Sequence, residues 1–177
     1  MKSLLISIKP KWCAKIMNGE KTIVIRKTMP KCDLPIDVYI YCTKDKEMAK
    51  MCKYSCDKET KAFLNLGKVV AKFTLNKVDK YVNGCNVAKK YPTFNDFEKI
   101  LTPACLYTDE LENYCDDLSF YAWHISNLVI FDKPKELNEF NKYTDKKIEW
   151  YSDLPKVRVM RSLTKAPQNM CYIETDN

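Results

Sequence analysis

The chain has 177 residues, of which 46% are hydrophobic and 30% are charged, a composition typical of a soluble globular protein with one sizeable core. No apolar run approaches the roughly 20 residues that a membrane-spanning helix needs, so the composition excludes that class. The opening MKSLLISIKPKW lacks a small-residue cleavage site and does not fit a secretory signal. Nine cysteines without such a signal indicate reduced thiols, and we expect a cytoplasmic protein without disulfides.

The net charge of +7 is unevenly distributed along the chain. Residues 1–80 carry 18 basic and 8 acidic side chains, whereas residues 81–177 carry 12 and 15, so the first part is +10 and the second −3. A basic patch of this kind indicates a polyanionic partner, and nucleic acid before a membrane, because no basic amphipathic helix with an aromatic face is visible. The alternative is a solvated surface, since the basic residues are 27 Lys and only three Arg.

Taken in chain order, the pattern predicts short strands interrupted by short helices. An apolar run opens the chain, and Pro10 then stands where the first turn of a helix accepts proline. Asn18 and Gly19 supply the end of that helix. Strands are predicted over residues 4–9, 22–26, 36–43, 68–81, 120–125, 128–131 and 170–174. Helices are predicted over residues 10–18, 93–101, 108–115 and 135–140.

The same pattern predicts one domain over residues 1–177. Polar, Lys-rich residues 44–62 and irregular residues 138–160 are expected to be variable insertions in it. Strands without regular βαβ alternation predict the α+β class, with a small, mostly antiparallel β-barrel and short surrounding helices.

Three segments resemble ASCH-domain proteins, which are relatives of the PUA-like barrels: SIKPKWCAKIMNGEKTIVIRK, FYAWHISNLVIFDKPKEL and LTKAPQNMCYIE. The signature of that family is Gly-x-Lys-x-x-Glu-x-Arg. Here Gly19, Lys21 and Arg26 match it, while Val24 stands where the family has glutamate. The resemblance implies a PUA-like barrel with a cleft, and RNA binding as the function. In some members it implies hydrolysis of an acylated cytidine or cleavage of RNA.

The residues themselves explain how this spacing could form a site. Side chains alternate along a strand, so Thr22, Val24 and Arg26 share one face. With Lys21 at the preceding turn, they predict a compact cationic floor for a phosphate or a nucleobase carbonyl. Val24 removes the carboxylate that could act as a general base. The alternative is that residues 23–25 are one strand buried on both faces.

Three functions follow, in the order in which we rank them. The first is a binding module for RNA or a modified nucleotide, whose cationic cleft consists of Lys9, Trp12, Lys21, Thr22, Val24 and Arg26. The second is a hydrolase of a modified nucleoside or RNA, in which Lys21 is catalytic and activates a hydroxyl or water. The third is a protein-interaction domain on the same barrel. Val24 places the enzyme below the binding module, because hydrolysis normally needs a base within hydrogen-bond reach.

The other candidate residues give weaker indications of function. Trp12 and Trp123 can stack an unpaired base, but their spacing also suits a core. His124 is the only histidine, and we expect a structural role for it. Zinc would need four thiolates, yet only one pair is tightly spaced, so we expect no metal and no cofactor. The four cysteines concerned are Cys32, Cys42, Cys52 and Cys56.

Overall fold

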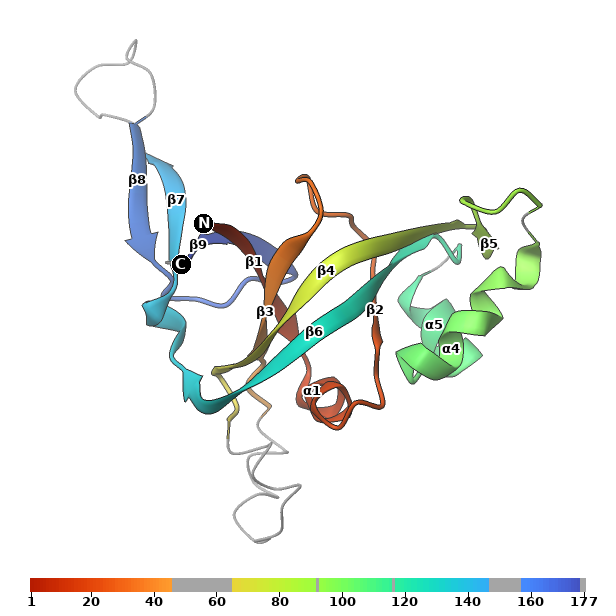
Figure 1. Cartoon of the computed structure of the whole chain (residues 1–177), viewed down its shortest axis with the longest axis horizontal. Coiled ribbons are helices and arrows are strands. Elements are labelled where there is room, and N and C mark those ends of the chain that lie inside the picture. The colour runs from red at the N-terminus through yellow and green to blue at the C-terminus, as the bar shows by residue number, and fades with distance from the viewer. Residues whose placement is uncertain (46–64, 92, 116, 147–156, 176–177) are drawn as a thin grey trace, which may run out of the picture. The chain divides into compact units, whose positions relative to one another are not determined.

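The computed structural model describes residues 1–45, 65–91, 93–115, 117–146 and 157–175 (Figure 1). Its contacts divide the chain into two compact units. The first comprises residues 1–10, 38–72 and 130–177, and the second comprises residues 11–37 and 73–129. Three strands contribute residues to both units, namely β3 (Ile36–Cys42), β4 (Val69–Val82) and β6 (Phe120–Lys135).

The first unit is a sheet with a short 3-10 helix. Its remaining elements are β1 (Lys2–Ile8), the 3-10 helix η2 (Leu137–Glu139), β7 (Asn141–Lys146), β8 (Val157–Ser162) and β9 (Met170–Glu174). The hydrogen-bonded order is β3-β1-β9-β7-β8. β1 pairs with β3 in parallel and with β9 in antiparallel orientation. One apolar core cluster of this unit comprises Leu5, Tyr41, Val69, Phe140, Leu163 and Ile173.

The second unit packs helices on strands. Its further elements are α1 (Pro10–Met17), β2 (Ile23–Arg26), β5 (Cys85–Asn86), the 3-10 helix η1 (Phe94–Phe97), α4 (Glu98–Ala104) and α5 (Thr108–Tyr114). β2 pairs antiparallel with β6, which neighbours β4, and β5 pairs with the end of β4.

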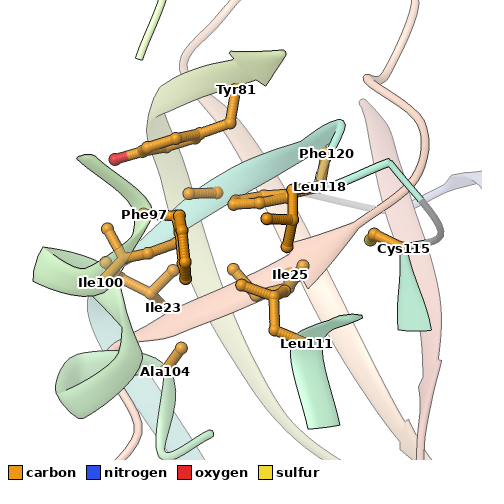
Figure 2. Close-up of a cluster of buried hydrophobic side chains, with 11 residues drawn as sticks. Ile23, Ile25, Tyr81, Phe97, Ile100, Ala104, Leu111, Cys115, Leu118 and Phe120 are labelled. Atoms are coloured by element: carbon orange, nitrogen blue, oxygen red, sulfur yellow. The ribbon is translucent and has the colours of Figure 1, made fainter. Parts of the chain in front are cut away.

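The core of the second unit lies between β2, β6 and the helices α4 and α5. Figure 2 shows Ile23 and Ile25 of β2 directed toward Ile100 of α4 and Leu111 of α5. Burial of each such side chain contributes about 1.5–3 kcal/mol. This packing holds α4 and α5 against β2 and so positions the C-terminal end of α4 and the N-terminal end of α5.

The structure confirms the α+β class and the predominance of antiparallel pairing. The strand order of the described residues has two ends, β2 and β8, so the sheet is mixed and is not closed into a barrel. Predicted helices at residues 10–18, 93–101 and 108–115 are confirmed as α1, η1 with α4, and α5. The helix predicted at 135–140 is the shorter η2.

The sequence predicts two strands where the structure has the single strand β6. Asn127 adopts a left-handed conformation, with φ of 48°, and interrupts the alternation without ending the strand. Pro134 stands near the end of β6, beyond residues 121–124, which are the residues of β6 that pair with β2. A proline is tolerated where no ladder hydrogen bond needs its missing N–H.

The predicted insertions fall largely on residues 46–64 and 147–156, outside the described part of the chain. Cys52 and Cys56 lie there too, so the four-cysteine alternative is not described. Seven of the nine cysteines lie in the described part of the chain, and no disulfide joins any two of these seven. Among the described helices, none combines the length and apolarity that crossing a membrane would require.

Candidate nucleic-acid interface

Lys21 is buried, although lysine is among the residues least often found inside a protein. Gly19 adopts a left-handed conformation, with φ of 78°, and turns the chain after α1. The backbone N–H of Lys21 then donates to the carbonyl of Lys15 at 3.0 Å. Its side chain is 5% exposed, and Nζ donates to the carbonyl of Ala104, the last residue of α4. Lys21 therefore caps the negative end of that helix.

Burial lowers the pKa of Lys21 from 10.5 to about 8. The nearby cations Lys15 and Arg26 lower it further, whereas Cys105 and Glu110 oppose the shift. An ammonium with this pKa can lose its proton close to neutral pH, which an ordinary surface lysine does not do.

The Trp12 side chain of α1 is only partly buried, and two ammonium groups lie near its ring. Lys11 Nζ is 4.3 Å and Lys21 Nζ is 4.8 Å from the centre of its ring, both within cation–π range. Lys11 also forms an ion pair with Glu110 of α5 at 2.9 Å. The same carboxylate accepts the backbone N–H of Tyr107 at 3.2 Å. The hydrogen bond from Lys11, followed by the smaller effect of the hydrogen bond from Tyr107, lowers the pKa of Glu110. This carboxylate is therefore ionised and is bound by both groups.

A shallow hollow of about 400 Å³ opens where α4 ends and α5 begins. Its lining mixes polar and apolar side chains: Lys15, Leu101, Thr102, Cys105, Leu106, Tyr107 and Thr108. Tyr107 is 77% exposed, so its ring is available to a ligand. We refer to Lys11, Trp12, Lys15 and Lys21, together with this hollow, as the Trp12 surface. All of it belongs to the second unit.

The strand β2 does not present an open floor. Val24 is 5% exposed and pairs across the ladder with Trp123, which is fully buried. Arg26 is 8% exposed, and burial lowers its pKa, with Tyr114 and Cys13 opposing the shift. β2 is therefore a strand buried on both faces, which is the alternative that the sequence left open. Val24 does not line a solvent-open cleft, contrary to the first prediction.

The other predicted residues are separated by the fold. Thr22 is exposed, and its backbone N–H donates to the carbonyl of Pro103 at 2.9 Å. Lys9 is exposed and belongs to the first unit, so its participation remains a prediction. His124 Nε2 lies 2.7 Å from Asp79 Oδ2, which supplies the partner that a structural histidine needs.

Sequence reasoning finds Trp12 and Lys21 but misses their neighbours from α4 and α5. Glu110 is 99 residues from Lys11 along the chain, and the Ala104 carbonyl is 83 residues from Lys21. No local spacing encodes such contacts. Lys11 and Lys15 lie on the same predicted helix as Trp12. Their closeness to Trp12 in the sequence is the signal from which they could have been predicted as site residues.

Comparison with known proteins agrees with the resemblance in sequence. A scan against protein-family models finds no match, and neither does a search of curated proteins. Among solved structures, ASCH from Zymomonas mobilis is similar with a TM-score of 0.60 at 14% identity, over 97% of this chain and 87% of that one. Two single-residue variants of that protein match with TM-scores of 0.59 and 0.60, also at 14% identity. Their coverage is 98% and 97% of this chain and 91% and 88% of theirs. The chain thus has the fold of an ASCH domain.

Proposed function

We propose that this chain is an ASCH-type module that binds single-stranded RNA, or a modified nucleotide, at the Trp12 surface without turning it over. The observation that carries the proposal is the partly exposed Trp12 ring with Lys11 Nζ 4.3 Å from its centre. Aromatic rings hold unpaired bases by stacking, and adjacent ammonium groups attract the phosphates. The chain also has the fold of the ASCH structures, and RNA binding is what its resemblance to ASCH-domain proteins implies.

The chemistry of the surrounding groups supports an unpaired base as the ligand. The hollow of about 400 Å³ offers the hydroxyls of Thr102 and Thr108 as donors and acceptors, and the exposed ring of Tyr107 as a second stacking surface. Small-molecule sites are commonly this size, with few polar groups among apolar ones. Lys15 lines the same hollow and brings a cation to it.

A binding titration with matched aromatic variants tests the proposal. An unstructured, fluorescein-labelled RNA of 12 nucleotides is titrated with the wild type, with Trp12→Ala and with Tyr91→Ala. Tyr91 is the control, because it is 77% exposed and carries Lys90 Nζ 5.3 Å from its ring centre. Loss of one stacked base costs about 1–3 kcal/mol, so only Trp12→Ala should weaken binding to that extent. Equal affinities of all three proteins would contradict the proposal.

A hydrolase is the second candidate, and the Lys21 pKa of about 8 favours it. A group with this pKa is suited to general base catalysis near neutral pH. We rank it below binding because Val24 cannot accept a proton and Glu110 is engaged by Lys11 and Tyr107. Release of acetate from an acetylated cytidine, or cleavage of RNA, by wild type but not by Lys21→Met would reverse this ranking.

A further inference from the structure

The ribbon formed by β7 and β8 places two cations directly opposite each other. Figure 1 shows the two strands side by side, and their register pairs Lys142 with Arg161. The Cβ atoms of such directly opposite residues lie about 4.5–5.5 Å apart, and like charges at this distance destabilise the pair. A sequence that served only the stability of the ribbon would avoid this arrangement.

Within the described part of the chain, neither cation takes part in an ion pair. Two acids stand in register close to this pair, Glu174 of β9 opposite Asn141 and Asp145 of β7 opposite Arg158, and neither is opposite Lys142 or Arg161. Because side chains alternate along a strand, Asn141 and Lys142 point to opposite faces. Glu174 lies 3.8 Å from the N-terminal ammonium instead. The repulsion between Lys142 and Arg161 is therefore not offset by a neighbouring carboxylate in register.

Protection of a sheet edge is the alternative explanation for these charges. β8 is one end of the strand order, and charged side chains on an edge strand hinder pairing with other chains. That explanation accounts for a charge on β8. It does not account for a second cation directly across from it, since a Lys–Glu pair would protect the edge and also stabilise the ribbon.

The choice of arginine points to phosphate. The chain has 27 lysines and only three arginines, and the residue of β8 opposite Lys142 is one of these three, Arg161. A second arginine of β8, Arg158, stands in register with Asp145 and does not bear on this argument. A guanidinium binds phosphate oxygens through two parallel hydrogen bonds, which an ammonium cannot do. Arg161 is exposed and Lys142 is half-buried, so an anion can reach both from solvent.

We propose that Lys142 and Arg161 together hold one backbone phosphate of RNA. The inference rests on the proposed function for the identity of the ligand. The phosphate neutralises both cations, so binding removes the repulsion that the free ribbon carries. Ribbons of two antiparallel strands are among the elements with which proteins contact nucleic acid.

A charge reversal tests this inference because it separates stability from binding. Lys142→Glu places opposite charges across the ribbon, so it should raise the melting temperature while weakening RNA binding about tenfold. The slope of log K against log salt should become shallower by about 0.7, the value for one phosphate of a single strand. Arg161→Gln should give the same loss of slope without adding an acid.

Lys165→Glu is the control, because Lys165 is exposed in the same unit and its replacement changes the net charge equally. An edge-protecting role predicts that Lys142→Glu and Lys165→Glu bind RNA alike, and that result would overturn the inference. The effect of inorganic tripolyphosphate on the stability of the protein distinguishes failure of this inference from failure of the proposed function. If wild type binds no RNA but tripolyphosphate stabilises it and not Arg161→Gln, the phosphate site stands and RNA is the wrong ligand. If tripolyphosphate stabilises both equally, the site itself is refuted.

Discussion

Lys21 places an ammonium group inside the second unit, and its burial makes that group easier to deprotonate. Its pKa is 10.5 in the unfolded chain and about 8 in the folded protein, chiefly because of burial. Between these values the unfolded chain binds a proton that the folded protein has released. The free energy of unfolding therefore rises with pH across this window and is lowest below about pH 8.

Replacement of Lys21 by methionine should abolish that dependence. Methionine has a similar volume but no charge, so the Lys21→Met protein should lose the rise of stability between pH 8 and 10, which amounts to about 2 kcal/mol in wild type. Denaturant unfolding at several pH values measures it, with Lys27→Met as the control because Lys27 is exposed. A rise that persists unchanged in Lys21→Met would show that Lys21 is not the titrating group.

Val24 gives a second test at the scale of one residue. Val24→Glu introduces the carboxylate of the ASCH signature into a position that is 5% exposed and opposite Trp123. We expect the variant to fold with a loss of about 1–3 kcal/mol, because Arg26 on the same face can pair with the new acid.

The double variant Val24→Glu/Arg26→Met tests whether Arg26 pairs with the new carboxylate. It should be less stable than the sum of the two single changes, because it leaves the carboxylate buried and unpaired. Additive losses in thermal or denaturant unfolding would mean that the glutamate does not meet Arg26.

The local spacing of residues predicts some of the site but not its burial. Gly19, Lys21 and Arg26 were identified because the ASCH signature is short and continuous in sequence. Whether their side chains are open or buried depends on α4 and α5, which pack against β2 from about 80 residues further along the chain. Periodicity along a four-residue strand cannot distinguish one buried face from two.

At the scale of elements, Asp96 fastens the segment that precedes α4. Its carboxylate accepts the backbone N–H of Thr93 at 3.0 Å and of Asn86 at 3.2 Å, and it pairs with Lys89. The hydrogen bond from Lys89 and then those from Thr93 hold the Asp96 pKa well below its usual range. One side chain thus joins β5, η1 and the loop between them.

Asp96→Asn should lower the melting temperature at neutral pH and reduce the loss of stability in acid. A depressed carboxyl pKa stabilises the fold above the unfolded value of about 4, and that stability disappears as pH falls further. Thermal unfolding at pH 7 and pH 3 measures both effects, with exposed Asp132→Asn as the control. The prediction fails if the two variants melt alike.

Elements with a buried face were the predictable ones. The helix α5 was anticipated because Leu111 follows an acidic first turn, and β3 because its apolar residues are β-branched. β7 and β8 were missed because their sequences lack the alternation of a half-buried strand. Tyr143 and Met160, which pair across them, are both exposed.

At the scale of the whole molecule, charge gives the most general prediction. Residues 1–80 carry a charge of +10, which should make binding of single-stranded RNA depend steeply on salt. Each neutralised phosphate contributes about −0.7 to the log–log slope. Binding measured from roughly 50 to 200 mM salt should therefore weaken progressively, and a flat response would remove the electrostatic basis of the proposal.

The indole N–H resonances of the protein offer the most direct test of the Trp12 surface. The chain has three tryptophans, so a ¹⁵N-labelled sample gives a distinct signal for each, and Trp12→Phe assigns the relevant one. Addition of an unlabelled RNA of 12 nucleotides at low salt should shift the Trp12 signal and leave that of fully buried Trp123 in place. A Trp12 signal that stays unmoved while RNA binds would contradict the account.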